Sequence, residues 1–363
     1  MKKRGLHGRL LTSQSFALAL AGMLGAAFPA IAEINCKGER GRLAAASTLN
    51  VRIDNDFFGG AGQDQGYSNG FLISSVSPNL VSYQNDPCLP GSIEVLNRYL
   101  MWLQPGGYDE QNMVMGLSQV LFTPTDRTKA ALIEEDRPYA AALLLSVGYN
   151  ARSGDHLRTS QIRIGVVGPS ALGEQVQNGA HKLLGQEPFD GWNNQLRDEP
   201  VLQLIHEHRW RWARAASASG WGWDATGHLG GSLGNFATYG NSGLEWRFGY
   251  QLPDDFGTAP LRPAGENASP ISEAVGRFDG LAGHMFLAVD GRWVLHDITL
   301  DGNTFRSSHS VDKRPLVADL AIGFAVTKGA WRFALARYYR TREFDGQRDI
   351  PVYGTFTVGR RFQ

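Results

Sequence analysis

The sequence predicts an all-β fold, a 12-stranded antiparallel transmembrane β-barrel with a short helix in an extracellular loop. Composition favours many short strands with unlike faces, since Gly accounts for 44 of 363 residues, aromatics for 10% and hydrophobic residues for only 42%. After the N-terminal segment no stretch of about 20 consecutive apolar residues occurs, which excludes a bundle of membrane-spanning helices. Apolar and polar residues alternate with a period of two in several segments, as barrel walls require.

The first residues have the pattern of a secretory signal peptide. A basic start at Lys2, Lys3 and Arg4 precedes an apolar run over residues 16–28, and Ala30-Ile31-Ala32 fits a cleavage site. The alternative is a membrane-anchoring helix, but the run is short and interrupted by glycine and proline. We therefore expect residues 1–32 to be removed and 33–363 to form a barrel domain in the bacterial outer membrane.

The alternation is clearest near residue 290 and at the C-terminal end. Polar side chains between the apolar ones include His284, Asp290 and Arg292, as expected for a lumen. The apolar or small residues of the first segment are Leu281, Gly283, Met285, Leu287, Val289, Gly291, Trp293 and Leu295. Those of the last segment are Ile350, Val352, Phe356, Val358 and Phe362. Each segment therefore reads as a strand with one lipid-facing side.

Twelve strand-like segments can be placed, an even number as bacterial barrels require. They lie near 47–57, 67–77, 112–123, 138–151, 156–168, 199–214, 220–233, 243–252, 280–297, 315–328, 330–343 and 350–362. By this count the long connections 78–111, with a helical pattern over 92–103, and 253–279 fall on the periplasmic side. A soluble β-sandwich is the competing fold, but aromatic residues gather near strand ends like an interfacial girdle: Trp210, Trp212, Trp221, Trp223, Tyr338 and Tyr339.

Charge and cysteine content limit the function classes. The formal net charge is zero, so that nothing suggests a nucleic-acid partner. Cys36 and Cys88 both belong to the exported part, where an oxidising compartment favours a disulfide over two thiols.

The segment 168–192 abandons the period of two for a helical one. Leu172, Val176, Ala180 and Leu183/Leu184 recur at helical spacing, with Ser170 as a candidate cap and Gly185 as a candidate end. Glu174, Gln177, Asn178 and His181 form a polar row beside this stripe. The sequence thus predicts an amphipathic helix in an outward loop that places an imidazole at the membrane surface.

The first predicted strand ends in polar residues, Asn55 and Asp56, after an apolar face. Such groups near hydrocarbon are costly unless they have a partner or a task. Asn55, Asp56 and Glu187 could offer oxygen ligands to a hard cation such as calcium, which would polarise an ester carbonyl. A neutral histidine nearby could take a proton from water. The alternative is a polar interfacial band without chemistry.

Several motifs, in order along nearly the whole mature chain, resemble the lipid A 3′-O-deacylase family of outer-membrane barrels. They are "NDFF" at 55–58, "DQGYSNG" at 64–70, "FTPTDRTK" at 122–129, "EDRPYA" at 135–140, "VGPSALGEQVQNGAHKLLGQE" at 167–187 and "LPDDFG" at 252–257. The resemblance implies a twelve-stranded barrel that removes the 3′-linked acyloxyacyl chain of lipid A in the outer leaflet of the lipopolysaccharide membrane, with dependence on Ca²⁺.

The resemblance also implies roles for individual residues. His181 matches the catalytic histidine, and Glu187 matches the acid that follows it. Asn55 and Asp56 match the Asn-Asp pair at the first strand's tip, and Lys129 matches a loop lysine near the active site. Ser68 stands where the family has threonine, so that a hydroxyl is retained.

The resulting hypothesis is hydrolysis by water that His181 activates, with a metal-polarised carbonyl and with Lys129 binding substrate charge. One alternative keeps the fold but makes Ser68 the nucleophile of an outer-membrane phospholipase. Another is a non-enzymatic porin-like barrel, in which His284, Asp290, Arg292 and Glu207 would line a pore.

Overall fold

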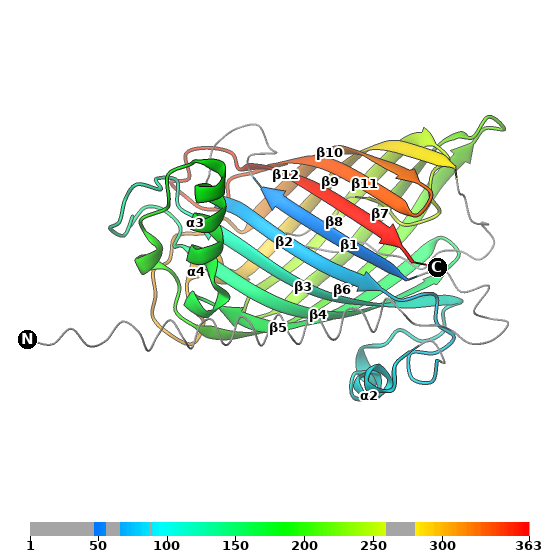
Figure 1. Ribbon diagram of the computed structural model, residues 1–363, viewed down its shortest axis with the longest axis horizontal. Coiled ribbons are helices and arrows are strands. Elements are labelled where there is room, and N and C mark those ends of the chain that lie inside the picture. The colour runs from blue at the N-terminus through cyan, green and yellow to red at the C-terminus, as the bar shows by residue number, and fades with distance from the viewer. Residues whose placement is uncertain (1–46, 56–65, 87–88, 259–279, 363) are drawn as a thin grey trace, which may run out of the picture.

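The computed structural model describes residues 47–55, 66–86, 89–258 and 280–362, and their strands close into one antiparallel barrel (Figure 1). Each strand pairs with its neighbours in sequence, and β1 (Thr48–Asn55) closes the barrel against β12 (Val352–Arg361). Twelve strands form this ring, which confirms the predicted fold class. No helix in the described ranges is long and apolar enough to span a membrane.

The remaining strands have these bounds: β2 (Gly66–Val76), β3 (Glu110–Thr123), β4 (Ala140–Ser153), β5 (His156–Val167), β6 (Glu199–Ala216), β7 (Trp221–Gly234), β8 (Ala237–Tyr250), β9 (Leu281–Asp297), β10 (Leu316–Lys328) and β11 (Trp331–Arg340). The helices are α2 (Gly91–Tyr99), α3 (Gly173–Leu184) and α4 (Ile298–Asp301), with 3-10 turns η3 (Met101–Leu103), η4 (Pro169–Ala171) and η5 (Trp192–Asn194).

The expected start of β8 near residue 243 is wrong. The strand begins at Ala237, and Tyr239 and Gly240 pair with Ser232 and Gly231 of β7. Small and polar residues fill this stretch, so that its sequence lacks the apolar alternation that predicts a strand. Pairing to β7 across a very short connection supplies the backbone hydrogen bonds that hold it in the sheet.

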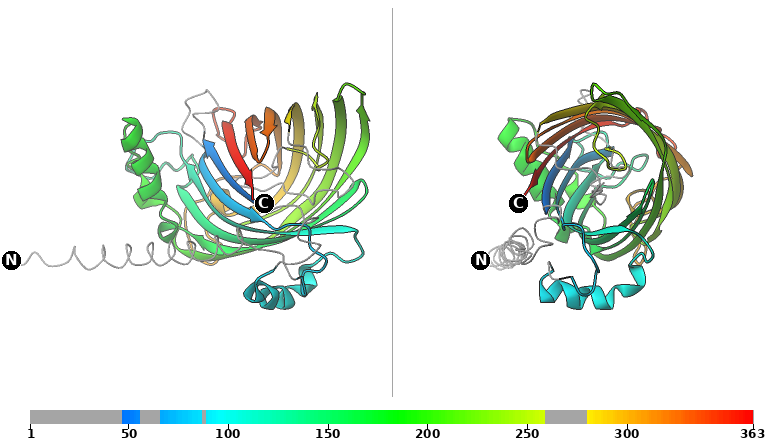
Figure 2. Two further views of the ribbon diagram at one scale, coloured as in Figure 1. Left: turned by 45° about the vertical axis from the view of Figure 1, so that its right-hand side comes forward. Right: turned by 90° about the vertical axis from the view of Figure 1, so that its right-hand side faces the viewer.

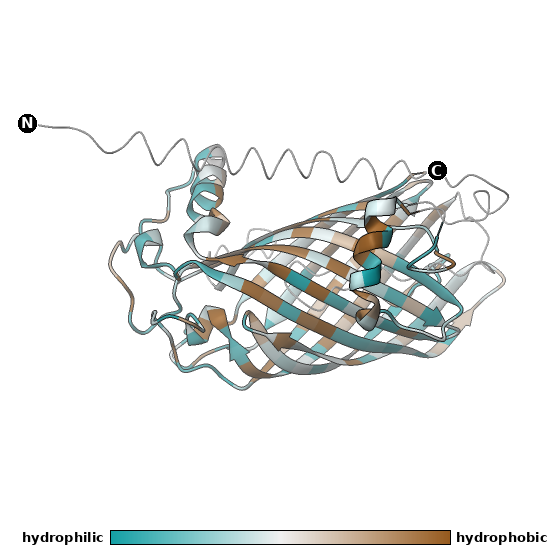
Figure 3. Cartoon of the chain, turned by 90° about the horizontal axis from the view of Figure 1, so that it is seen from below, coloured by the Kyte–Doolittle hydropathy of each residue, from teal (hydrophilic) through white to brown (hydrophobic). Residues whose placement is uncertain are grey.

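The outer face of the wall is apolar. Along β9 the side chains of Leu281, Met285, Leu287, Val289, Trp293 and Leu295 are exposed, while Ala282, His284, Phe286, Ala288 and Asp290 are buried. Figure 3 shows this alternation of hydrophobic and hydrophilic residues along the strands. Trp212, Trp221, Trp223 and Tyr339 are exposed as the girdle requires, but Tyr338 is 2% exposed and stacks on Tyr353 inside the barrel.

Ion pairs fill the barrel's interior near the end that carries α3. Arg340 donates to Asp319 and Glu343, at 2.7 and 3.1 Å, and Glu343 also accepts from Arg137, at 2.8 Å. Arg292 adds a further bond to Asp319. These groups are almost completely buried, and buried charges are tolerated only when they are paired in this way. The lumen at this end is therefore polar, with its charges paired to one another.

The described part of the connection after β8 folds into the barrel at the opposite end. Phe256 is 1% exposed, between the guanidinium groups of Arg152 and Arg211, which lie 5.2 and 5.0 Å from its ring centroid. Arg209 donates to the carbonyl of Phe256 at 3.0 Å, and Arg247 donates to Asp255. We call residues 253–258 the luminal hook. The rest of the predicted periplasmic connection 253–279 lies outside the described residues.

The connection between β2 and β3 lies outside the ring of strands and carries α2, as the view along the barrel shows (Figure 2). It is at the end of the barrel away from α3, which agrees with its predicted place on the periplasmic side. The predicted helical stretch is present as α2 followed by η3. Cys36 and Cys88 lie outside the described residues, so that their pairing stays a prediction.

Candidate functional site

The predicted helix of the fifth-to-sixth strand connection is α3, Gly173–Leu184. It ends at Gly185 in the left-handed conformation (φ 69°), as predicted, because glycine adopts this geometry without strain. Ser170 does not cap the helix. Its backbone N–H and hydroxyl instead bond the carboxylate of Asp198, at 2.7 and 2.9 Å, and the helix starts after Leu172 without a side-chain cap.

The loop that carries α3 folds down over the outside of the wall, beside β3 and β4 (Figure 1). Ala171, Phe189 and Trp192 of the loop form a buried cluster with Leu121 and Ala141, which point outward from the strands, and with Tyr139. We call this set the loop–wall cluster. These contacts hold the helix against the outer, lipid-facing side of the wall and not above the opening of the barrel.

Two contacts show how closely the loop approaches the wall. A Cβ on Gly173 would lie 2.4 Å from the Cβ of Ala141 and 2.8 Å from the Trp192 ring, so that only glycine fits. Gln119 points outward from β3 and donates to the Ala171 carbonyl at 2.6 Å. The start of α3 therefore lies close to the strands because Gly173 allows the approach and Gln119 adds a hydrogen bond.

His181 of this helix is buried, with only 5% of its surface exposed. Its ring contacts that of Phe189 edge-on, with the two ring centroids 5.0 Å apart. Its Nδ1 lies 2.7 Å from the Glu187 carbonyl oxygen. Because a carbonyl only accepts hydrogen bonds, Nδ1 carries the proton, and in the neutral ring Nε2 presents a lone pair. The Gln177 amide nitrogen lies 3.4 Å from Nε2. The imidazole is thus oriented as a proton acceptor at Nε2.

Glu187 supports the histidine through its main chain, while its carboxylate side chain is exposed. The return of the chain is fixed by Asn178, whose side-chain oxygen accepts from the Phe189 N–H at 2.8 Å and whose nitrogen donates to the Phe189 carbonyl at 3.4 Å. This pair of hydrogen bonds to one residue positions the segment that orients His181. The sequence placed Asn178 in the polar row of the helix, but helical spacing could not show that Asn178 bonds Phe189.

The described end of β1, at Asn55, lies on the same side of the barrel. Asn55 points outward and donates to the Ser68 carbonyl at 3.2 Å. Ser68 stands at a bulge between β2 and β3, is completely buried, and its hydroxyl donates to the Leu121 carbonyl at 3.4 Å. Asp54 points inward and accepts hydrogen bonds from Arg52 and Tyr67, at 2.5 and 2.6 Å. Asp56 lies outside the described residues.

The strand register connects the tip with the histidine. Asn55 pairs with Asn69 of β2, which pairs with Leu121 of β3, and Leu121 belongs to the loop–wall cluster that contains Phe189. Neighbouring strands are about 4.8 Å apart, so that Asn55 and Leu121 are separated by roughly 10 Å along the wall. Asn55 and the loop–wall cluster that His181 contacts through Phe189 therefore lie about two strands apart on one patch of the outer face, with Ser68 buried in β2 between them.

Lys129 is brought to this patch by its loop. The Asp190 N–H donates to the Arg127 carbonyl at 3.0 Å, and the Asn194 amide donates to the Ala130 carbonyl at 2.8 Å. The Lys129 side chain is exposed, with its Nζ 3.9 Å from Asp126, a pair that water screens strongly. Its ammonium group thus lies at the surface beside the histidine loop.

The oxygen donors predicted for calcium are of the right chemical type, since hard cations prefer amide and carboxylate oxygens. Asn55 places such a donor at the hairpin tip, and the exposed Glu187 carboxylate belongs to the facing loop. Within the described ranges no three His, Cys, Asp or Glu side chains form a metal-binding group. Asp56, the remaining predicted ligand, lies outside the described residues, so that the calcium site stays a prediction.

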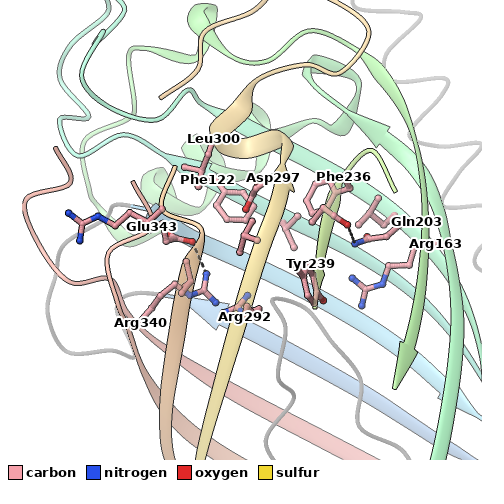
Figure 4. A pocket seen from close by; sticks show the side chains of 16 residues that line it. Phe122, Arg163, Gln203, Phe236, Tyr239, Arg292, Asp297, Leu300, Arg340 and Glu343 are labelled. Carbon is pink, nitrogen blue, oxygen red and sulfur yellow. Dashed lines mark hydrogen bonds and ion pairs between the residues drawn. The ribbon is translucent and has the colours of Figure 1, made fainter. Parts of the chain in front are cut away.

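A cavity inside the barrel is separate from this patch. Figure 4 shows its lining, which includes Phe122, Gln203, Arg292 and Glu343, and its volume of about 70 Å³ has room for roughly five waters. Phe122 faces this cavity, whereas its neighbour Leu121 faces outward to the histidine loop. The two regions lie on opposite faces of the wall.

A family model described as outer membrane protein LpxR matches residues 16–362. Among solved structures, LpxR from Salmonella typhimurium shares 18% sequence identity and a TM-score of 0.66, and the match covers 87% of this chain and 100% of that one. The translocator domain of the autotransporter NalP from Neisseria meningitidis is 11% identical, with coverage of 98% and 100% and a TM-score of 0.34. No curated protein sequence matches the chain.

Proposed function

Because this chain belongs to the LpxR family of outer-membrane proteins, we propose that it is a lipid A 3′-O-deacylase. It would hydrolyse the ester that links the 3′ acyloxyacyl chain to lipid A in the outer leaflet. The observation that carries this proposal is the oriented, buried His181 on the outward face of the wall, with Asn55 on the same face about two strands away. A substrate that remains in the membrane can reach this face without entering the lumen.

His181 is the general base of the proposed reaction. Its Nε2 takes a proton from a water molecule as that water attacks the ester carbonyl, and the Glu187 carbonyl stabilises the imidazolium through the Nδ1 proton. The imidazolium then returns the proton to the leaving alcohol oxygen as the ester C–O bond breaks, which releases the fatty acid. General-base catalysis of this kind contributes about a hundred- to ten-thousandfold in rate. Gln177, 3.4 Å from Nε2, adds a polar partner on the same side of the ring.

Asn55, Asp56 and Glu187 are the residues that would hold Ca²⁺. When bound, the cation supplies polarisation of the ester carbonyl. Lys129 binds negative charge, either a lipid A phosphate or the oxyanion of the reaction. Ser68 places its carbonyl under Asn55, and its hydroxyl is directed to the main chain of β3, which favours a positioning role over that of a nucleophile.

The deciding experiment is mass spectrometry of lipid A from cells that express the chain, with and without a calcium chelator. The proposal predicts loss of the mass of the 3′ acyloxyacyl unit, and chelation is expected to restore the full mass. Unchanged lipid A beside correctly folded protein in the outer membrane would refute the deacylase assignment. Loss that persists under chelation would retain the hydrolase and remove calcium.

Export belongs to the same proposal. Residues 1–32 have the pattern of a signal peptide, and cleavage after Ala32 would release a barrel that begins at Glu33. The intact mass of the protein purified from outer membranes tests this directly. A mass that includes the first 32 residues would contradict it.

A further inference from the structure

The connection between β2 and β3 is firmly attached to the outside of the barrel. Its Leu80, Tyr83, Leu89 and Leu103 are buried with Met113 and Tyr149, and Ile93, Leu96 and Leu100 pack on the same cluster together with Met115, Val147 and Ile162 of the wall. Asn97 is fully buried, accepts from Tyr149 at 2.7 Å and donates to the Tyr83 carbonyl at 2.5 Å. One side of α2 is thereby committed to the wall.

The opposite side of α2 and η3 is exposed and largely apolar. Val95, Tyr99 and Trp102 follow one another at spacings of four and three, so that they share a face, and they are 50, 77 and 61% exposed. Met101 adds a further exposed apolar side chain, at 58%. We call these four residues the α2 stripe. Arg98 is exposed on the same side of the helix.

The α2 stripe adjoins the lipid-facing belt of the barrel. Leu145, Ile164 and Leu202 pair across β4, β5 and β6, and each is about half exposed on the outer face. The wall residues beneath the helix, Val147 and Ile162, form the next outward pair on the same strands, two residues or about 7 Å further along. The helix therefore sits directly at the lower edge of a surface that faces hydrocarbon.

Other exposed aromatic residues lie at the same end of the barrel. Trp212 and Trp221 belong to the β6–β7 hairpin at the end of the barrel away from α3 and are 64 and 50% exposed. Tyrosine and tryptophan prefer the depth of lipid headgroups, where the ring is in apolar surroundings and the polar edge meets water. A helix that lies in this plane buries its apolar side chains among acyl chains and leaves its cations near phosphate.

From this placement we propose that the α2 stripe inserts into the inner, phospholipid leaflet of the outer membrane. The α2 stripe fits a phospholipid layer for two reasons. It continues the lipid-facing surface of the strands, and Arg98 on the same side can bind the headgroup phosphate. The helix would then anchor the barrel in the leaflet opposite to that of the proposed chemistry. This inference does not depend on the deacylase assignment.

Photocrosslinking in the full-length protein tests the proposal without altering its cysteines. The photoreactive amino acid p-benzoylphenylalanine replaces Tyr99, Trp102 or Val95 in separate variants, and outer membranes of expressing cells are irradiated. The control position is Ala218, an exposed residue in the β6–β7 turn at the same end of the barrel. Heat-modifiable migration on gels establishes that each variant has folded.

The expected result is an intact-mass increase of one phospholipid at the three stripe positions and none at Ala218. Crosslinks to another polypeptide would overturn the proposal and identify a protein partner or a second copy instead. Folded variants that gain no lipid at any stripe position would also overturn it, because a side chain in the leaflet cannot avoid neighbouring acyl chains.

Discussion

His181 owes its orientation to a main-chain oxygen and not to a carboxylate. The Glu187 carbonyl fixes the proton on Nδ1, and burial against Phe189 limits rotation of the ring. A carbonyl cannot accept a proton in exchange, so that the group orients the base without competing for the transferred proton. The identity of residue 187 therefore matters less to this contact than the path of its backbone.

Replacing the imidazole tests the proposed base. His181→Ala is expected to reduce deacylation by about a hundred- to ten-thousandfold, the range of general-base catalysis, while the barrel stays folded. Lipid A mass spectrometry measures the product, and heat-modifiable migration monitors the fold. Ordinary activity in the folded variant would remove His181 from the mechanism.

Substitution of Ser68 distinguishes hydrolysis by activated water from attack by a serine nucleophile. Its hydroxyl is completely buried and donates to the Leu121 carbonyl, so that Ser68→Ala removes a hydrogen bond and no reacting group. We expect partial loss of activity, from the shift of the hairpin tip, and a conservative Ser68→Thr variant should retain most of it. Complete loss in Ser68→Ala, with a trapped acyl-enzyme in the parent protein, would establish the nucleophile instead.

At the scale of elements, the α3 loop depends on close approach to the wall. Gly173→Ala places a Cβ against Ala141 and Trp192, and overpacking of this kind costs about 1–3 kcal/mol. The expected result is faster proteolysis of residues 169–194 and lower activity, with an unchanged barrel. Gly179→Ala is the matched control in the same helix, because its Cβ would meet nothing and alanine favours helix. Equal effects of both substitutions would contradict the proposed close packing of the α3 loop on the wall at Gly173.

A second element, the loop around α4, is expected to respond to acid. Burial alone would raise the pKa of Asp301, but hydrogen bonds from His296 and Lys313 lower it to about 2. A lowered carboxyl pKa contributes stability that is complete above the ordinary value near 3.8 and is lost as the pH falls through about 2.

Pepsin cleavage within 302–315 should therefore increase between about pH 4 and pH 2 in the parent protein. In Asp301→Asn this increase should be absent, because the amide has no charge to lose; comparing the two proteins at each pH removes the protease's own pH dependence. The same pH response in both would show that Asp301 does not control the loop.

At the scale of the whole molecule, the filled interior distinguishes this barrel from an open pore. The ion pairs around Arg340 occupy one end, and the luminal hook occupies the other, where Phe256 lies between two guanidinium groups. Inward-facing charges that fit a channel in sequence are thus partners of one another. Arg292, for example, pairs with Asp290 at 3.2 Å, whereas His284 bonds the hydroxyl of Thr258 in the hook at 2.6 Å.

Truncation of the hook tests its contribution. Phe256→Ala removes a ring that is 1% exposed, and such changes in a packed interior cost about 3–5 kcal/mol. Thermal unfolding in detergent micelles should occur at a clearly lower temperature, and ion conductance in planar bilayers should increase. Phe248→Ala, on the outer face at 42% exposure, is the control and should leave conductance unchanged. Unaltered stability and conductance in Phe256→Ala would show that the hook does not hold the interior together.

The strands were largely predictable because each is encoded by a local period of two. The lipid-facing residues of β9 and the lumen-facing His284, Asp290 and Glu207 were assigned correctly for this reason. Where the period is missing, as over Tyr239 and Asn241, the beginning of β8 was missed. Tyr338 was misplaced because a tyrosine near a strand end suits either the girdle or the lumen, and only its stacking on Tyr353 decides between them.

The sequence by itself determined the number and faces of the strands, the helix that carries His181 and its glycine end, since each follows from neighbours within a few residues. Only the tertiary structure decided that the Glu187 carbonyl orients the imidazole, that the hook enters the lumen and that the α2 stripe adjoins the lipid belt. These arrangements join segments far apart in the chain. Their energy comes from barrel closure and packing across the wall, which no local period of residues records.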